Sequence, residues 1–418
     1  MIFGTTWFLV FSFVAAAIYI AVRPWPTARL LLMLVASVAF YFHFAGLAGF
    51  LVIASLATFT YFAGLRIHAS VTASDRPSSG LLALCLAPAV LALLYFRFYG
   101  FLTNTLTDAA GWLGFAVAPA VPWLQSVQPV IVPLGISFFA FEFCHYLVDV
   151  YHRATPVRNP LHFALFALFY PRLASGPIVR FQQIVPQFER LPVATVDDVS
   201  QGLIRISIGF AKKFLLADPA AQLVAMSFQP NHILTGTDVI WLSLLLYIRI
   251  YMDFGGYCDM AIGFARLWGI RLPENFNFPF IASSISAFWR RWHITLSLWI
   301  RDYIYIPLGG GHVPDWRKAF NLLFAMALCG LWHGSAWNFV LWGVLHGVAL
   351  QIGHGLSALC DWSARASPNI PMLRRAGAIA VTVMGWVVTQ IFVGLTWIFF
   401  FFPATDAWHI LTQLRRLL

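Results

Sequence analysis

Long apolar runs recur along the whole chain and are separated by short polar segments. A helix needs about 20 apolar residues to cross the roughly 30 Å hydrocarbon core of a bilayer. Backbone polar groups in lipid must be satisfied within the protein, so such runs predict bundled transmembrane helices rather than a barrel of short strands. The candidate runs cover about residues 2–22, 28–45, 48–65, 80–102, 129–150, 160–175, 199–217, 237–267, 320–340, 339–358 and 376–402.

The regular pattern breaks between about residues 171 and 320. Non-helical backbone at membrane depth is tolerated only where protein buries it or water lines it. We therefore expect re-entrant or interfacial helices around a central funnel here, and functional residues among them. The prolines that interrupt this stretch are Pro171, Pro177, Pro186, Pro273, Pro279 and Pro307.

These patterns predict an all-α, polytopic membrane protein of roughly 10–12 transmembrane helices. We interpret residues 1–418 as a single transmembrane domain. It has peripheral N-terminal helices at 1–128, a core at 129–358 that holds the candidate functional residues, and a C-terminal helix at 376–402. The run at 2–22 lacks a basic start and a small-residue cleavage site, so it predicts a first spanning helix rather than a removed signal peptide.

Composition fits a protein whose solvent is lipid. The 418 residues are 60% hydrophobic and only 10% charged, whereas about a quarter of the residues of a soluble domain are charged. The formal net charge is +10, but Lys and Arg lie in short loops between apolar runs, where they determine topology. This placement argues against nucleic-acid binding, and it predicts that the N-terminus lies outside the cytoplasm.

The stretch SAFWRRWHITLSLWIRDY at 286–303 places Arg290, Arg291 and His293 among tryptophans. Trp at headgroup level, with Arg facing phosphate or water, is typical of an interfacial helix. The same residues suit a substrate site, because guanidinium groups bind phosphate through two donors. Both interpretations stay open, and Arg290, Arg291 and Trp292 are candidate substrate contacts.

The stretch LCGLWHGSAWNFVLWGVLHG at 328–347 contains two histidines, His333 and His346. Polar side chains within spans tend to face the bundle interior or a water-filled cavity, and a neutral imidazole can accept a proton near neutral pH. His333 is therefore a candidate general base, against the alternative of a structural histidine bonded between helices. For His346 the residues favour the structural interpretation; His346, Trp332 and Asn338 are further candidate substrate contacts.

Two carboxylates, Asp253 and Asp259, lie in YMDFGGYCDMAIGF at 251–264, and the polar residues Glu274, Asn275 and Asn277 follow. Carboxylates within a membrane suggest ion transport, but the chain lacks the paired interrupted helices of inverted-repeat transporters. We interpret both as groups that pair helices or orient a catalytic histidine, and as candidate substrate contacts. No metal site is expected, because no HExxH motif or spaced cysteine pair is present.

Six stretches, in order, resemble the membrane-bound O-acyltransferase family, and most of all its bacterial alginate O-acetyltransferase branch. The D-alanyl transfer proteins of the same family are near relatives. The stretches are PLGISFFAFEFCHYLVDVYHR at 133–153, FYPRLASGPIVRFQQI at 169–184, DFGGYCDMAIG at 253–263, LPENFNFPF at 272–280, WRRWHITLSLWIRDYIYIPLGG at 289–310 and LWHGSAWNFVLWGVLHG at 331–347.

The resemblance implies transfer of an acyl group, with acetyl favoured, from a cytoplasmic thioester to a hydroxyl of an exported or cell-surface polysaccharide. The donor would be acetyl-CoA or an acyl carrier protein, with no permanently bound cofactor. Transfer would be direct or through a periplasmic acyltransferase or esterase-like partner, at the bacterial inner membrane. By the same resemblance, His333 takes the place of the family's catalytic histidine and His293 that of a second functional histidine.

Some residues depart from the family pattern. Glu142 stands where related sequences often carry Gln, and Cys258 stands where Ser is common. The chain also looks short at its C-terminus beside the alginate enzymes and is nearer in length to the D-alanyl transfer proteins. These departures leave acetyl and D-alanyl transfer as alternatives, and a transporter or a non-catalytic scaffold as functions of another class.

Overall fold

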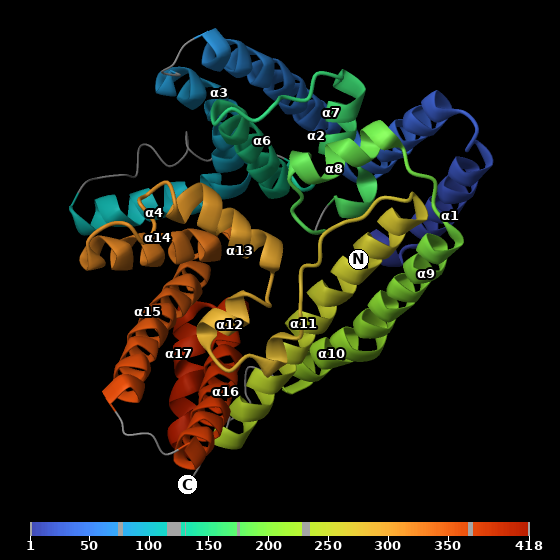
Figure 1. Cartoon of the computed structure of the whole chain (residues 1–418). Helices are drawn as coiled ribbons and strands as arrows, with labels where there is room; N and C mark the ends of the chain where they lie inside the picture. Colours follow the sequence, from blue (N-terminus) through green and yellow to red (C-terminus); the bar gives the residue numbers. More distant parts are fainter. Residues whose placement is uncertain are drawn as a thin grey trace. The chain divides into compact units, whose positions relative to one another are not determined.

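The structure, a computed structural model, describes residues 2–73, 78–114, 127–129, 131–173, 176–227, 235–366 and 371–416, without the side chains of 356–378 and 416. Every regular element in these ranges is a helix (Figure 1), which confirms the all-α prediction. The chain divides into two compact units. Unit 1 comprises Met1–Ile208 and Tyr257–Pro273, and unit 2 comprises Gly209–Gly256 and Glu274–Leu418.

Within the described residues, four helices are long and apolar enough to cross a membrane: Pro26–Ala73, Ser79–Trp112, Gly236–Leu267 and Ile379–Phe401. Thr6–Ala21 is a shorter apolar helix. Each of them falls on an apolar run of the sequence, and together they make the protein a multi-pass membrane protein. The figure of 10–12 crossings and the division at residues 128 and 358 stay predictions.

Unit 1 is built mainly from its N-terminal helices. Gly46 interrupts α2 with φ 66° and ψ 178°, a backbone conformation that glycine adopts without steric cost, at the turn expected between two apolar runs. Helix α2 packs against α6 and α7. The helices of this part are α1 (Thr6–Ala21), α2 (Pro26–Ala73), α3 (Ser79–Leu93), the π-helical turn η2 (Leu94–Phe98), α4 (Tyr99–Trp112), α6 (Ile136–Tyr151) and α7 (Pro160–Leu168).

Short elements follow α7, as the prolines of this stretch predict. They are the 3-10 turn η3 (Tyr170–Arg172), α8 (Phe181–Arg190) and α9 (Val196–Phe210). Arg172 of η3 forms an ion pair with Glu142 of α6, and both side chains are almost fully buried. The acidic residue at position 142 therefore neutralises a buried guanidinium, which a neutral glutamine would not do.

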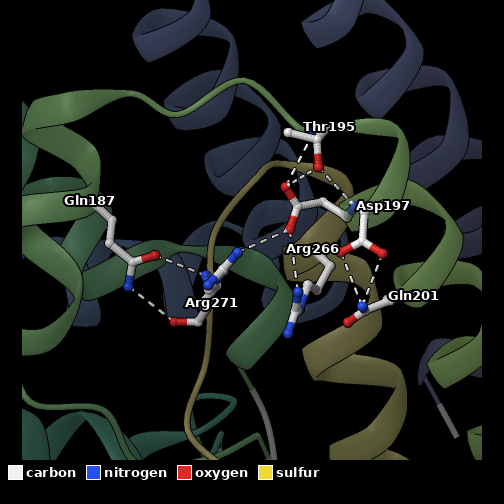
Figure 2. A network of polar contacts seen from close by, with 7 residues as sticks. Gln187, Thr195, Asp197, Gln201, Arg266 and Arg271 are labelled. Atoms are coloured by element: carbon white, nitrogen blue, oxygen red, sulfur yellow. Dashed lines mark hydrogen bonds and ion pairs between the residues drawn. The ribbon is translucent and has the colours of Figure 1, made fainter.

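A polar network holds the start of α9 to the segment that follows α11 (Figure 2). The carboxylate of Asp198 accepts hydrogen bonds from the backbone N–H and the hydroxyl of Thr195, at 3.2 and 2.8 Å. It also pairs with Arg266 at 3.2 Å and with Arg271 at 3.7 Å. The side-chain amide of Gln187 exchanges two hydrogen bonds with the backbone of Arg271. All these residues belong to unit 1.

Unit 2 contains the remaining helices, and the long helix α11 (Gly236–Leu267) continues from unit 2 into unit 1. The other elements are the π-helical turn η4 (Ala211–Ala217), α10 (Asp218–Ser227), η5 (Pro279–Ile281), α12 (Ile285–Trp289), α13 (Ile294–Ile300), the π-helical turn η6 (Arg301–Tyr305), α14 (Asp315–His333), α15 (Trp337–Ala366), α16 (Pro371–Phe401), α17 (Ala404–Thr412) and η7 (Gln413–Arg416).

Among the described helices of unit 2, α14 and α15 make the most extensive contact. Their backbones touch at Gly330 and Gly343. A Cβ at Gly330 would overlap the carbonyl oxygen of Phe339, and one at Gly343 would overlap that of Met326. The two glycines each precede a histidine by one helical turn, so this contact sets the positions of His333 and His346.

One sequence expectation is wrong in its detail. The stretch 286–303 was expected to form one interfacial helix with tryptophans at its surface, but it breaks into α12 and α13 around His293, which has the left-handed conformation φ 41°, ψ 54°. Its tryptophans, Trp289, Trp292 and Trp299, are buried inside the protein. Hydrogen bonds from residues distant in sequence, described below, hold this break, so local periodicity could not reveal it.

Candidate active site

His333 is the last residue of α14, and the extended residue Gly334 follows it. Its side chain is half-buried, in contrast to the fully buried His293 and His346. Aromatic rings surround the imidazole: the ring centroids of Trp342 and Phe400 lie 5.5 and 5.2 Å from it. The helix end and the close helix crossing thus hold one imidazole in an apolar setting while part of it stays accessible.

His293 lies between α12 and α13, outside the four spanning helices, and faces His333 with ring centroids 6.0 Å apart. Only 1% of it is exposed, and among the described residues neither ring nitrogen has a hydrogen-bond partner. The edge of Phe254 packs on the ring at 4.6 Å. Burial, and to a smaller extent the His333 imidazole, holds the pKa of His293 well below its usual value, so this ring is neutral.

His346 is fully buried within the same unit. Its Nε2 lies 3.1 Å from the hydroxyl of Thr396, and that hydroxyl donates its proton to the carbonyl of Val393 at 2.9 Å. Because the hydroxyl has only one proton, Nε2 of His346 must be the donor. This geometry fits the structural interpretation of His346 as a group bonded between α15 and α16.

A cluster of tryptophans separates His346 from His333. The ring of Trp342 lies 4.7 Å from His346 and is stacked on Trp397 at 5.4 Å. Trp397 in turn lies 5.0 Å from Trp292, which is 2% exposed. Trp292 therefore belongs to the packed interior of unit 2, where it supports the neighbouring His293 and does not anchor a membrane surface.

The remaining predicted contacts lie in different environments. The ring of Trp332 is buried and lies 5.8 Å from His293 and 5.0 Å from His333. Asn338 donates a hydrogen bond to the carbonyl of Phe399 at 3.0 Å, so it ties the start of α15 to the end of α16. Trp332 thus borders both histidines, whereas the Asn338 amide serves the helix contact.

The two arginines ahead of His293 also differ. Arg290 is exposed. The guanidinium of Arg291 donates a hydrogen bond to the carbonyl of Asn277 at 3.0 Å. Arg291 therefore helps to hold the segment after residue 273 against the segment that carries His293.

The two carboxylates that suggested transport belong to different units. Asp253, with half its side chain exposed, pairs with Lys213 at 2.7 Å, and Lys213 also pairs with Asp218 at 2.7 Å. Asp259 lies in unit 1, where it pairs with Arg205 at 3.0 Å between α11 and α9. Each carboxylate has its own cation, and the pair of Asp259 with Arg205 links two helices as expected of a helix-pairing group.

Sequence reasoning recognised the histidines but missed the groups that hold them. Asn275, in the segment LPENFNFPF, was noted only as a polar residue, and Thr396 was not singled out. A Gly-x-x-His spacing occurs in both α14 and α15, at Gly330 and His333 and at Gly343 and His346. That repeat was the available signal that both histidines lie one turn from a helix crossing.

Comparison with known proteins identifies the family of the chain. The model of the membrane-bound O-acyltransferase family matches residues 150–396, which include all the candidate site residues. A probable alginate O-acetylase AlgI of Azotobacter vinelandii is 38% identical over 366 residues, which are 86% of this chain and 69% of that protein. The protein of the same name from Pseudomonas aeruginosa is 36% identical, over 89% of this chain and 66% of its own length.

Relatives of lower identity have names that state other activities. A peptidoglycan O-acetyltransferase of Helicobacter pylori is 35% identical over 65% of this chain and 54% of its own length. A teichoic acid D-alanyltransferase of Bacillus subtilis is 31% identical over 55% of this chain and 62% of its own length. The family match covers more than half of the chain and contains both facing histidines. The chain therefore belongs to the membrane-bound O-acyltransferase family and is an O-acyltransferase.

Proposed function

We propose that this protein transfers an acetyl group from a cytoplasmic thioester to a hydroxyl of an exported or cell-surface polysaccharide. The observation that carries the proposal is the pair of facing imidazoles, His333 and His293, inside the part of the chain that matches the family. The similarity to probable alginate O-acetylases, over most of this chain, favours acetyl as the acyl group and a polysaccharide as the acceptor.

His333 serves as the general base. Its unprotonated nitrogen takes the proton of the acceptor hydroxyl while that oxygen attacks the thioester carbonyl carbon. The new oxygen–carbon bond forms, the carbon–sulfur bond breaks, and the proton returns to the departing thiolate sulfur. General-base assistance of this kind is worth about 10²–10⁴ in rate. The half-buried position of His333 supports this role, because the acceptor oxygen must reach the imidazole ring.

His293 orients or polarises the donor. As a neutral imidazole without a hydrogen-bond partner among the described residues, it keeps one N–H available for the thioester carbonyl oxygen. The exposed Arg290 is suited to the phosphates of coenzyme A or of a carrier's phosphopantetheine. Trp332, which borders both imidazoles, shapes the space between donor and acceptor.

The protein works at the bacterial inner membrane in this proposal, because the thioester donor is cytoplasmic and the acceptor is exported. A periplasmic acyltransferase or esterase-like partner would receive the acetyl group where transfer is not direct. D-alanyl transfer to a cell-envelope polymer is the second candidate, and the similarity to teichoic acid D-alanyltransferases is the observation that favours it.

The test is acyl transfer by the purified protein in proteoliposomes, with labelled acetyl-CoA on one side and an oligosaccharide acceptor on the other. The His333→Ala variant should lose transfer by about 10²-fold or more while keeping its expression and thermal stability. His312→Ala is the matched control, since His312 is exposed on the loop before α14. Transfer that survives in His333→Ala would remove the imidazole from the mechanism, and transfer from a D-alanyl carrier alone would favour the second candidate.

A further inference from the structure

The backbone of His293 is held in a conformation that a residue other than glycine rarely adopts. With φ 41° and ψ 54°, it lies in the left-handed region, which is sterically unfavourable for an L-residue. Such a conformation persists only where surrounding contacts determine it, and these cluster at active sites. The contacts that determine it should therefore also determine where the imidazole lies.

Asn275 supplies these contacts on the C-terminal side of His293. The backbone N–H of Ile294 donates to the carbonyl of Asn275 at 2.9 Å. The backbone N–H and the hydroxyl of Thr295 both donate to the Asn275 side-chain oxygen, at 3.1 and 2.9 Å. Asn275 is 1% exposed, so water does not reach this place to replace the hydrogen bonds when a substitution removes them.

The N-terminal side of His293 is held by the same segment. The backbone N–H of Asn277 donates to the carbonyl of Arg291 at 2.9 Å, and the Arg291 guanidinium donates back to the carbonyl of Asn277 at 3.0 Å. Residues 275–277 therefore run beside residues 291–295 and fix both flanks of His293.

The arrangement also explains why the imidazole is not used as a helix cap. His293 occupies the N-cap position of α13, where a side chain normally accepts a hydrogen bond from one of the first backbone N–H groups. It makes no such bond, because the Asn275 side chain accepts from the N–H of Thr295 in its place. The ring is left to point toward His333 with both nitrogens unused among the described residues.

We infer that Asn275 is a positioning residue: it caps α13 from a distant segment, holds His293 in its left-handed conformation and so frees the imidazole for the acyl donor. The inference rests on the proposed role of His293. Asn275 itself touches no reacting atom in this scheme. Its loss should change the rate of the chemical step more than the binding of the acceptor, because a displacement of about 1 Å at a reacting group costs about 10²-fold in rate.

The experiment is a double-mutant cycle on single-turnover transfer from labelled acetyl-CoA in proteoliposomes. Asn275→Ala should lower the rate by about 10- to 100-fold with a change in acceptor KM of less than about threefold. Asn275→Asp, which keeps an acceptor oxygen for Thr295, should recover most of the loss. In a His293→Ala background, Asn275→Ala should cause no further loss, because coupled residues share one effect.

Asn321→Ala is the matched control. Asn321 is a buried asparagine of the same unit and donates to the carbonyl of Leu308 at 2.9 Å, away from His293. It should match Asn275→Ala in thermal stability but keep its rate per folded molecule. If Asn275→Ala lowers the rate by the same factor with and without His293, Asn275 does not act through that ring and the inference is overturned. If His293→Ala alone leaves the rate unchanged, the proposed role of His293 fails instead.

Discussion

At the residue scale, Thr396 supplies a hydrogen-bond acceptor to one ring nitrogen of the fully buried His346. The Thr396 hydroxyl accepts from Nε2 of His346 and donates to the carbonyl of Val393. We expect Thr396→Val to lower the free energy of unfolding by about 1–3 kcal/mol, because it leaves a buried N–H without an acceptor. Thermal unfolding in detergent measures this.

The control for this pair replaces both partners. Thr396→Val combined with His346→Leu removes the orphaned donor, so the double variant should recover part of the loss seen with Thr396→Val alone. A double variant that is less stable than the sum of the two single changes would contradict the assigned hydrogen bond. Acyl transfer per folded molecule should change far less than in His333→Ala.

The carboxyl of Asp198 should make the free energy of unfolding depend on pH. Burial raises the pKa of this carboxyl, but the hydrogen bonds from Thr195 and the charges of Arg271 and Arg266 outweigh it, so the pKa lies below its ordinary value of 3.8. A carboxyl whose pKa is lower in the folded than in the unfolded protein stabilises the fold at pH values above its pKa in the unfolded protein. That stabilisation is lost as the pH falls through the pKa of the carboxyl in the folded protein.

We therefore expect Asp198→Asn to be less stable than the unaltered protein at pH 7 and the difference to shrink below about pH 4. Thermal unfolding as a function of pH is the measurement. Asp197→Asn is the control, since the neighbouring carboxylate is exposed and, among the residues that the structure describes, accepts hydrogen bonds from the side chain of Gln201 alone. A difference that is constant from pH 7 to pH 3 would show that the charge of Asp198 is not what stabilises the network.

At the element scale, the crossing of α14 and α15 determines where the candidate base lies. Gly330 and Gly343 meet backbone to backbone, so a methyl group at either position must push the helices apart. We expect Gly330→Ala to cost about 1–3 kcal/mol of stability through overpacking and to lower acyl transfer strongly, because His333 lies one turn further along α14. Thermal unfolding and transfer in proteoliposomes measure the two effects.

Gly355→Ala is the control on the same hairpin. Gly355 lies on α15, and no described atom lies within 4 Å of the position of an added Cβ. Alanine is the better helix former, so this change should leave stability unchanged or raise it by about 0.5–1 kcal/mol. Equal losses for Gly330→Ala and Gly355→Ala would mean that helix contact is not the reason for glycine at position 330.

At the scale of the whole molecule, both facing histidines and the groups that hold them belong to unit 2, whereas the buried pair of Arg172 with Glu142 belongs to unit 1. Removing one partner of a buried ion pair typically costs about 3–5 kcal/mol, because the other charge is left alone. We expect Arg172→Met to destabilise the protein by about this amount while transfer per folded molecule stays within about twofold.

The double variant Arg172→Met with Glu142→Leu should regain most of that stability, because no unpaired charge stays buried. Chaotrope unfolding of the purified protein distinguishes the single variant from the double one. A large loss of transfer by the folded double variant would contradict the assignment of Arg172 to stability alone.

Sequence patterns predicted the helices of this protein, because helix formation depends on interactions between residues near in the sequence and on the surrounding lipid. Apolar runs reveal spanning helices, since lipid requires each helix to bond its own backbone. The gap between the apolar runs at 28–45 and 48–65, and the prolines between residues 171 and 320, indicated interruptions that the structure contains. The six family stretches identified the acyltransferase family and gave His333 and His293 as candidates.

Tertiary structure alone decided how these histidines are held. The break at His293 depends on hydrogen bonds with Asn275 and Asn277. These residues are too far from His293 in the sequence for the helical periodicity of residues 286–303 to indicate the bonds. The same holds for Asp253 and Asp259, which are six positions apart in the sequence yet pair with cations in different units. The sequence by itself determined the helices and the family. Hydrogen bonds and ion pairs form between atoms that meet in space, so the packing of the helices decided which polar groups face one another.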